Sequence, residues 1–475
     1  MIAADAKPIV VVGAGKTGLA VARHLARRGE RVVLSDRRDA QALGEARATL
    51  ERELGGAAGL VAWETGGHRE ETLRGASLIV LSPGVPPLPA VATARAAGVP
   101  ITGELELAAR AIDAPIVGVT GTNGKSTVTA LAGAMAKATG RATFVGGNLG
   151  TPLVDAVGTD AATVDGLCVV EMSSYQLETV ERLRPRAAAL LNLTPDHLDR
   201  YGDLAAYGAA KTKIAARMGA GDALVVNGDD PEVARALDVW ARRRFGDHAA
   251  SPLRGPNVYR FVRDPDPHGR RLAYCDGGDY VLRLDWGEER YPQALSQLVG
   301  NHNKANVLAA LLLLRASNLA SPGAVRDGLG GFRALPHRME LVAERGGVRF
   351  YDDSKATNVD SVVAGLDGFP TPFSLIAGGR DKGGSYAPLV AALGAATCRG
   401  VVAIGEAAPL IEAALRGSGV ACERAADLPA AVAQARARVA AGEAVVLSPA
   451  CSSFDMFRDY EHRGEVFRAA AEAQR

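Results

Sequence analysis

The sequence predicts an α/β protein built from three successive α/β blocks. In each block, apolar runs of strand length end in Gly or polar residues, and stretches rich in Ala and Leu with a helical pattern follow them. The first block opens with a glycine-rich turn between a strand and a helix, and the second opens with a sequence typical of a phosphate-binding loop. We therefore expect a Rossmann-like N-terminal domain, a central P-loop ATPase-like domain and a Rossmann-like C-terminal domain, over residues 1–112, 113–334 and 335–475.

The composition limits the kinds of partner. The chain has 475 residues, of which 48% are hydrophobic, and this is ample for several cores. Its 54 Lys and Arg nearly balance its 53 Asp and Glu, so no net field attracts nucleic acid or an anionic membrane. The N-terminal apolar run is too short for a signal peptide, and the longest later run, VLAALLLL, is too short to span a bilayer. We expect a cytoplasmic protein with small-molecule partners, and neither nucleic acid nor membrane as a partner.

The first glycine-rich turn lies in PIVVVGAGKTGLAVARHL. Gly13, Gly15 and Gly18 satisfy the pattern G-x-G-x-x-G, and Asp36 ends the next apolar run, as in dinucleotide-binding proteins. The same turn can hold any pyrophosphate, because free backbone N–H groups and the helix dipole at a helix N-terminus favour anions. A NAD-dependent oxidoreductase is one alternative, although it would leave the two later blocks unexplained.

The second glycine-rich turn lies in VTGTNGKSTVTA. It does not place a glycine where the usual P-loop has its first one, but it joins a predicted strand, PIVGV, to a predicted helix, STVTALAGAMAKA. Gly121 and Gly124 allow tight turns close to oxyanions, Lys125 adds a charge for the outer phosphates, and Ser126 or Thr127 adds a hydroxyl for Mg²⁺. We interpret this turn as a shorter phosphate loop; the alternative is a plain turn with a surface lysine.

Further polar residues follow the strands of the second block. Glu171 ends the apolar run GLCVV, and Asp196, His197 and Asp199 come after AAALLNL, so these groups are expected at the carboxyl edge of the sheet. Lys211 lies on a short predicted helix directly afterwards. Taken singly, the glutamate could be a surface or capping residue, the histidine a structural hydrogen-bonding group and the lysine a solvated charge.

The remaining elements follow the same reasoning. Between residues 252 and 300, short alternating runs such as YVLRLDW predict antiparallel strands, and NHNKANVLAALLLLRA predicts a helix. In the third block, FSLIAGG, GVVAIG and EAVVLSP predict three strands separated by Ala-rich helices. Ser448 and Pro449 could bind a ligand or simply end the last of these strands.

Several motifs together carry a resemblance to a known family. GTNGKST, EMSSYQLE, NLTPDHLDRY, YGAAK, GNHNKAN, PHRME, DDSKATN, GGRDKGG and LSPACSSFDMFRDYEHRG stand in family order across nearly the whole chain. In this respect the chain resembles the Mur ligase family. The resemblance implies the three-domain Mur ligase architecture and ATP-dependent amide bond formation, in which ATP phosphorylates a carboxylate and an amine then attacks the acyl phosphate.

The resemblance also implies a substrate pair. The elements DSKATN, LSPACSSFDMF, DRR and SPG favour the branch that adds D-glutamate to UDP-N-acetylmuramoyl-L-alanine in peptidoglycan synthesis. A sibling ligase with another amino acid, or one that adds glutamate to folate, is the alternative. A non-catalytic nucleotide-binding protein is disfavoured, because the four residues that the family uses for catalysis, Lys125, Glu171, His197 and Lys211, are all present.

Carried over by motif, the resemblance implies ATP and two Mg²⁺ sites. The expected metal ligands are Ser126, Glu171, His197 and a carbamylated Lys211. The expected ATP contacts are Gly121, Thr122, Asn123, Gly124, Lys125, Ser126, Thr127, Asn303, Asn306, Arg338 and Asp353. Without the resemblance, Asn303 and Asn306 would be interpreted as capping residues at the start of a helix.

The two other substrates are expected in the first and third blocks. The residues matching the family's uridine-substrate site are Gly15, Lys16, Thr17, Asp36, Arg37, Ser82 and Gly84, with Asn148 from the central block. Those matching the amino-acid site are Lys355, Thr357, Lys382, Ser453, Phe454 and Tyr460. Phe454 and Tyr460 differ from the residues common in the family, so the pocket wall is expected to differ as well. The family also implies a monomer.

Overall fold

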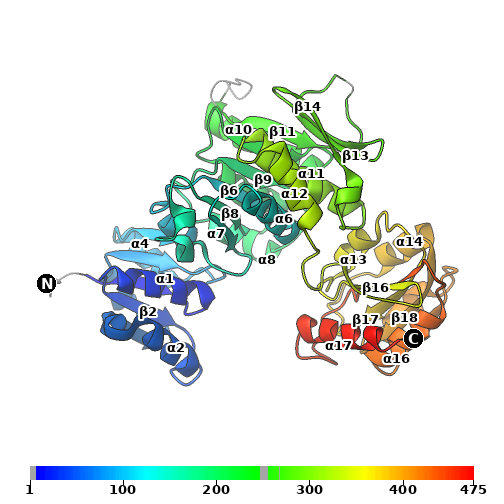
Figure 1. Cartoon of the computed structure of the whole chain (residues 1–475). Helices are drawn as coiled ribbons and strands as arrows, with labels where there is room; N and C mark the ends of the chain where they lie inside the picture. Colours follow the sequence, from blue (N-terminus) through cyan, green and yellow to red (C-terminus); the bar gives the residue numbers. More distant parts are fainter. Residues whose placement is uncertain (1–6, 247–254, 267, 475) are drawn as a thin grey trace. The chain divides into compact units, whose positions relative to one another are not determined.

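A computed structural model describes residues 7–246, 255–266 and 268–474. The strands of these residues form three sheets, one in each predicted block (Figure 1). Backbone contacts group the chain into two compact units, of which one contains the first sheet and most of the central sheet and the other contains the third sheet. A single buried apolar cluster includes residues of both the first and the central sheet, such as Val11 and Ile116, so these two sheets share a core.

The first sheet is parallel throughout and has the strand order β3-β2-β1-β4-β5. The chain therefore moves outward from β1 to β3 and then crosses to β4, so the order reverses between β1 and β4, where open α/β sheets bind ligands. The strands are β1 (Ile9–Val12), β2 (Val32–Asp36), β3 (Val61–Thr65), β4 (Leu78–Leu81) and β5 (Ile101–Gly103). The helices are α1 (Lys16–Arg27), α2 (Gly44–Leu54), α3 (Glu70–Arg74), α4 (Pro89–Ala96) and α5 (Glu104–Ala109).

A glycine sets the close approach of α1 to the turn before it. A Cβ atom added at Gly18 would lie 1.8 Å from the carbonyl oxygen of Gly13, so no side chain fits there. The glycine-rich turn thus brings the first turn of α1 against the end of β1, as the sequence predicts.

The central sheet has nine strands in the order β14-β13-β12-β11-β10-β9-β6-β8-β7. Every residue of β6, β8 and β9 is buried, because helices cover both faces of this parallel part. The strands are β6 (Ile116–Thr120), β7 (Thr143–Gly147), β8 (Leu167–Glu171), β9 (Ala187–Leu190), β10 (Ala223–Asn227), β11 (Asn257–Phe261), β12 (Leu272–Asp276), β13 (Asp279–Leu284) and β14 (Gly287–Pro292). The helices are α6 (Lys125–Lys137), α7 (Ser174–Leu177), α8 (Leu198–Tyr201), α9 (Leu204–Thr212), α10 (Pro231–Phe245), α11 (Asn301–Ala316) and α12 (Pro322–Gly331).

Beyond β12, the far edge of the central sheet is antiparallel, as predicted from the alternating runs. For β11, which lies in the same predicted region, the prediction is wrong: β11 pairs in parallel with both β10 and β12, since helix α10 carries the chain from β10 to β11 as a crossover. β12 and β13 are neighbours joined only by Gly277 and Gly278, both with positive φ, and so short a connection reverses the chain. The next connection, between β13 and β14, is equally short. The helix predicted over NHNKANVLAALLLLRA is confirmed as α11.

The third sheet has the order β15-β16-β20-β17-β18-β19 and is parallel except for β15. Two apolar clusters cover its two faces. The strands are β15 (Glu340–Arg345), β16 (Val348–Asp352), β17 (Phe373–Gly378), β18 (Cys398–Ile404), β19 (Cys422–Arg424) and β20 (Ala444–Leu447). The helices are α13 (Val359–Leu366), α14 (Ala387–Ala395), α15 (Ala408–Leu415), α16 (Leu428–Ala437) and α17 (Tyr460–Glu472).

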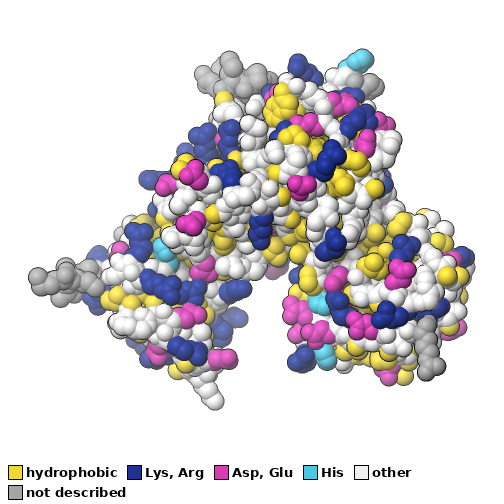
Figure 2. All heavy atoms as spheres, in the orientation of Figure 1, with side chains coloured by type: hydrophobic (Ala, Val, Ile, Leu, Met, Phe, Trp, Pro, Cys, Tyr) yellow, Lys and Arg dark blue, Asp and Glu magenta, His cyan; other side chains and the backbone are white. Residues whose placement is uncertain are grey.

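The surface is charged without a dominant sign. Basic and acidic side chains are interspersed over the face drawn in Figure 2, in keeping with the balance of charges in the sequence. Among the described residues, none of the helices combines the length and the apolar character needed to cross a membrane.

Candidate active site

The second glycine-rich turn forms a short loop between β6 and α6, at the place predicted for a phosphate loop. Gly124 has φ 82° and Gly121 has φ 151°, and a Cβ atom at Gly121 would lie 2.9 Å from Leu191, so both positions require glycine. Lys125 is the first residue of α6, and its ammonium donates to the carbonyl oxygens of Gly121 (3.0 Å) and Thr122 (2.7 Å). The lysine therefore folds over the loop whose backbone would surround a phosphate.

The segment after β9 holds this loop in place. Asn192 accepts a hydrogen bond from the backbone N–H of Asn123 (2.7 Å) and donates to its carbonyl oxygen (3.1 Å). The backbone N–H of Thr194 donates to the Thr122 hydroxyl (3.1 Å), and the Thr122 N–H donates to the carbonyl oxygen of Asn192. Asn192 was not predicted, because its role depends on two loops that meet only in the folded protein.

Glu171 is the last residue of β8 and lies beside Val119 of β6 in register, next to the loop. Its side chain is buried, and Oε1 accepts a hydrogen bond from Asn148 at 2.7 Å. Its other oxygen, Oε2, is buried and accepts no hydrogen bond. Because an unsatisfied buried carboxylate oxygen is unfavourable, this atom fits a role as ligand of a hard cation such as Mg²⁺.

Lys211 lies on α9 with its ammonium beneath the loop. Only 1% of the residue is exposed, and Nζ donates to the carbonyl oxygen of Gly121 at 2.7 Å. Nζ also lies 4.5 Å from the ring centre of Tyr207. Burial, and then the nearby charge of Lys125, lower the pKa of Lys211 to about 6, despite the opposing carboxylates of Asp196 and Glu171.

His197 lies at the N-terminus of α8 in a left-handed conformation with φ 54°. Its Nδ1 is 2.9 Å from the hydroxyl of Tyr175, and its Nε2 is 3.5 Å from a carboxylate oxygen of Asp196. The imidazole is also 6.2 Å, between ring centres, from the Tyr207 ring that contacts Lys211. The structure thus gathers Lys125, Glu171, His197 and Lys211 at the carboxyl edge of the central sheet.

In the first sheet, Asp36 anchors the glycine-rich turn. It accepts hydrogen bonds from the backbone N–H of Ala14 (2.7 Å) and from the backbone and guanidinium of Arg38. Although burial opposes ionisation, the bonds from Arg38 and Ala14 hold the pKa of Asp36 well below its usual range. Ser82 donates to the Gly13 carbonyl oxygen at 2.8 Å, so the turns after β1 and β4 meet where the strand order reverses. Around them, Gly15, Lys16, Arg37 and Gly84 are exposed, and Thr17 is half-buried.

In the third sheet, Asp353 follows β16 and is buried. Ser448, directly after β20, donates to one oxygen of Asp353 at 2.6 Å, and the backbone N–H of Met339 donates to the other at 3.2 Å. Burial raises the pKa of Asp353 to about 7 in spite of these bonds. Ser448 therefore ends the strand and also holds the carboxyl group of Asp353 through a hydrogen bond.

The predicted amino-acid residues form two polar pairs. The ammonium of Lys355 donates to the hydroxyl of Tyr460 (3.1 Å), and that of Lys382 donates to the hydroxyl of Thr357 (3.0 Å). Ser453 is buried, whereas Phe454 is 63% exposed. In α11, Asn306 donates to Asn303 (3.1 Å), which donates to the carbonyl oxygen of Val299 (2.8 Å), so both Asn side chains engage in local hydrogen bonds at the helix start.

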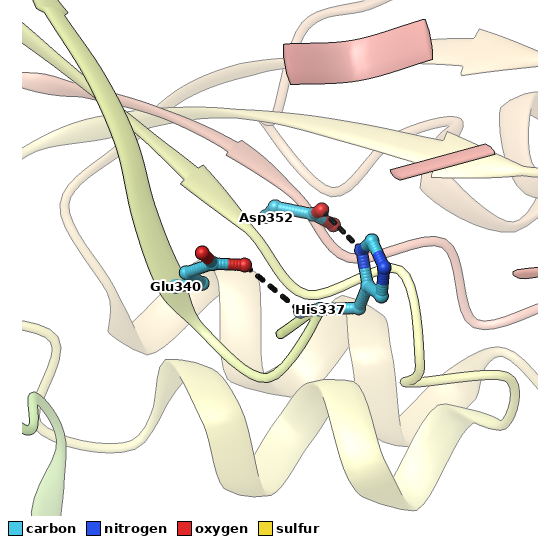
Figure 3. Close-up of side chains that lie close together, drawn as sticks. All are labelled: His337, Glu340 and Asp352. Carbon is cyan, nitrogen blue, oxygen red and sulfur yellow. Dashed lines mark hydrogen bonds and ion pairs between the residues drawn. The ribbon is translucent and has the colours of Figure 1, made fainter. Parts of the chain in front are cut away.

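His337, Glu340 and Asp352 lie close together (Figure 3), and His337 and Glu340 flank Arg338 in the sequence. His337 Nδ1 is 2.7 Å from Asp352, and Glu340 accepts the backbone N–H of His337 (3.1 Å) as well as a bond from Arg468 (2.7 Å). The hydrogen bond to Asp352 is the main cause of a raised pKa of His337. These contacts indicate an ion-pair cluster that holds the segment in shape.

Arg463 is the largest fully buried side chain among the described residues and was not predicted. Its guanidinium donates to the hydroxyl (2.9 Å) and carbonyl oxygen (2.8 Å) of Ser354 and to the carbonyl oxygen of Cys451 (3.1 Å). It therefore ties the loop after β16 to the loop after β20. In the sequence, Arg463 stands out only by its position within the motif LSPACSSFDMFRDYEHRG.

A phosphate loop on a parallel sheet, with a buried carboxylate at the end of the neighbouring strand, defines a nucleotide-binding protein of the P-loop class. Three segments match known families: residues 7–103 match the Mur ligase MurD-like N-terminal domain, 119–314 the Mur ligase middle domain and 337–451 the Mur ligase glutamate ligase domain. The chain belongs to the Mur ligase family.

Individual relatives agree with this assignment. The chain is 45% identical to the UDP-N-acetylmuramoylalanine--D-glutamate ligase of Syntrophotalea carbinolica, covering 98% of each chain, and 46% identical to the ligase of the same name from Anaeromyxobacter dehalogenans, covering 98% of this chain and 97% of the relative. Among solved structures, it resembles MurF from Acinetobacter baumannii (TM-score 0.61, 15% identity, 99% and 95% covered) and MurC from Thermotoga maritima (TM-score 0.58, 19% identity, 98% and 99% covered). At these identities, the likeness to solved structures shows the fold.

Proposed function

We propose that the chain is an ATP-dependent ligase that joins D-glutamate to UDP-N-acetylmuramoyl-L-alanine in the synthesis of peptidoglycan precursors. The observation that carries the proposal is the group of Lys125, Glu171, His197 and Lys211 around the loop at residues 121–124. The names of the relatives and the glutamate ligase domain at residues 337–451 support the choice of amino acid.

The proposed reaction activates a carboxylate. A carboxylate oxygen of the uridine-linked substrate attacks the γ-phosphorus of ATP, and ADP leaves. The amine of D-glutamate then attacks the acyl carbon, loses a proton, and the tetrahedral intermediate expels phosphate to leave an amide. Lys125 and the backbone N–H groups of residues 121–124 stabilise negative charge on the transferring phosphoryl group.

The three blocks divide the substrates in this proposal. Residues 1–112 bind the uridine-linked substrate through the turns after β1 and β4, with Asn148 reaching it from the central block. Residues 113–334 bind ATP. Residues 335–475 bind D-glutamate through the pairs Lys355–Tyr460 and Lys382–Thr357 and through Ser453, because a dicarboxylate needs several donors while its amine stays free.

Two Mg²⁺ ions fit the donor set of the central block. Ser126 and Glu171 would hold the first ion, and the unsatisfied Oε2 of Glu171 supports this assignment. His197 and a carbamylated Lys211 would hold the second. When bound, the ions neutralise charge on the phosphate oxygens.

The environment of Lys211 supports carbamylation. An ammonium would repel Mg²⁺, whereas a carbamate offers it carboxylate-like oxygens. Because the pKa of Lys211 is lowered to about 6, the amine is mostly neutral at pH 7 and its lone pair can attack CO₂, forming an N–C bond with loss of a proton.

We also propose that the protein acts in the cytoplasm as a monomer. A substrate linked to a soluble nucleotide and the supply of ATP both agree with this location. A sedimentation measurement at micromolar concentration tests the monomer.

Phosphate release tests the proposed function. The enzyme is given ATP, Mg²⁺ and UDP-N-acetylmuramoyl-L-alanine, together with D-glutamate, L-glutamate, L-alanine, L-lysine or meso-diaminopimelate in separate reactions. Release that depends on D-glutamate, with a product heavier by one glutamyl residue, is the expected result. Release with a different amino acid would assign the chain to a sibling specificity, and no release with any of them would refute the ligase activity.

A further inference from the structure

Tyr175 lies on α7. No part of the proposed reaction uses it, yet its hydroxyl contacts His197 in the candidate active site. The helix begins with a capping box, in which Ser173 and Gln176 exchange hydrogen bonds between side chain and backbone. This cap fixes the start of the four-residue helix Ser174–Leu177 and therefore the position of Tyr175. The hydroxyl of Tyr175 lies 2.9 Å from Nδ1 of His197.

The ring of Tyr175 is held between two neighbours. The guanidinium of Arg200 lies 4.8 Å from the centre of the Tyr175 ring. The ring of Tyr201 stacks on the same ring, with 6.1 Å between the ring centres. Arg200 is itself fixed, because it pairs with Glu178 at 2.6 Å and donates to the carbonyl oxygen of Val85 at 3.1 Å. With both ring and helix held, the hydroxyl is a preorganised hydrogen-bonding partner for the imidazole.

We infer that Tyr175 is a positioning residue: its hydroxyl oxygen accepts the Nδ1–H of His197 and so keeps the Nε2 lone pair available for a metal ion. A histidine that binds a metal through one ring nitrogen commonly donates its other N–H to an oxygen, which fixes both tautomer and ring orientation. This inference rests on the role of His197 in the proposed function.

The surroundings of His197 leave the Tyr175 hydroxyl as the group that can fix the tautomer and orientation of the imidazole. The backbone of His197 is left-handed, and its side chain is 42% exposed, so burial alone does not fix the orientation of the ring. One carboxylate oxygen of Asp196 lies 3.5 Å from Nε2, and the other accepts a hydrogen bond from the backbone N–H of His197 (3.0 Å). The Tyr175 hydroxyl is thus the one short contact to a ring nitrogen of His197 that the described residues provide.

The test uses the full-length enzyme and three variants. Tyr175→Phe removes the hydroxyl and keeps the ring. Tyr201→Phe is the matched control, because its hydroxyl donates to Glu178 (2.7 Å) within the same aromatic cluster. His197→Ala identifies the signals of that histidine and the metal site to which it contributes.

Two readouts are needed. The first is the ¹⁵N spectrum of the metal-free enzyme labelled in histidine, which reports the tautomer of His197. The second is the affinity for Mn²⁺ in the presence of a non-hydrolysable ATP analogue. We expect the Nδ1–H tautomer in wild type and in Tyr201→Phe, and its loss in Tyr175→Phe together with an affinity for the second Mn²⁺ that is about tenfold weaker.

A wild-type spectrum with the proton on Nε2, or an unchanged spectrum in Tyr175→Phe, would overturn the inference. If His197→Ala binds Mn²⁺ as tightly as wild type, the metal role of His197 in the proposed function fails. In that case the tautomer spectrum alone decides whether Tyr175 holds the ring.

Discussion

At the scale of single residues, two buried groups of the site lack a full set of partners. Glu171 keeps one buried oxygen without a hydrogen bond, and Lys211 is buried with a lowered pKa and one bond to the loop. Both arrangements are unfavourable for a resting side chain, and the proposed cation at Glu171 and the proposed carbamate at Lys211 would relieve them. The neighbours of a site residue therefore influence its charge, as burial and Lys125 do for Lys211.

Replacing Lys211 with Ala tests the carbamate. We expect kcat to fall by about 100-fold or more, because a ligand of the second metal is lost. Short carboxylic acids such as formate or acetate, added to the assay, should restore part of the activity. Lys213→Ala is the control, since Lys213 lies two residues away, is exposed and donates to the carbonyl oxygen of Glu178. An active Lys211→Ala enzyme that ignores added carboxylates would exclude the carbamate role.

Asp353 predicts a pH dependence of stability. Its folded pKa of about 7 lies above the ordinary value near 3.9, so the folded state binds this proton more tightly than the unfolded state does. The stabilisation by the proton is complete below about pH 4 and is lost as the pH rises to about 7.

Asp353→Asn should remove that part of the pH dependence. Between pH 5 and pH 8, we expect the free energy of unfolding of the wild type to fall relative to the variant, by on the order of 2 kcal/mol. Thermal unfolding at both values of pH measures the difference, with the exposed Asp360→Asn as a control that keeps the wild-type slope. Parallel curves for wild type and Asp353→Asn would contradict the assignment.

At the scale of elements, the sequence predicts the strongly apolar strands and misses the weak ones. The runs at 9–12, 78–81, 116–120 and 444–447 are continuous and apolar, and they form strands at the predicted places. β3, β5, β7, β15, β16 and β19 were not predicted. Five of them lie at the edges of their sheets and lack such a run, and in β16, an internal strand, Arg349 interrupts the apolar pattern.

The same limit applies to the site. Residues at strand ends, such as Glu171, could be placed because the ends of parallel strands meet at one edge of a sheet. Their partners could not: Asn192, Tyr175 and Arg463 act through hydrogen bonds between segments distant in sequence. Spacing along the chain carries no information on such contacts.

Asn192→Ala tests how far one loop depends on another. Loss of its two bonds to Asn123 should loosen the phosphate loop and raise the KM for ATP by about tenfold, with a smaller effect on the other substrates. Asn227→Ala is a matched control at the end of β10, where the side chain accepts a bond from the backbone of Asp229. An unchanged KM for ATP in Asn192→Ala would show that the loop keeps its shape without this residue.

At the scale of the whole molecule, three sheets share one proposed reaction. Most of the loops that carry the proposed site residues follow the carboxyl ends of parallel strands, which is the general location of sites in open α/β sheets. The family matches run in the same order, with an N-terminal, a middle and a glutamate ligase domain. In the proposed reaction, ATP activates the substrate carboxylate as an acyl phosphate before the amine attacks.

Transfer of oxygen-18 tests this claim most directly. UDP-N-acetylmuramoyl-L-alanine labelled in both oxygens of its carboxylate is incubated with the enzyme, ATP, Mg²⁺ and D-glutamate, and the products are analysed by mass spectrometry. An acyl phosphate predicts that one labelled oxygen appears in the released phosphate and the other remains in the new amide. Label in AMP, which an acyl adenylate would produce, or phosphate without label would contradict the proposed mechanism.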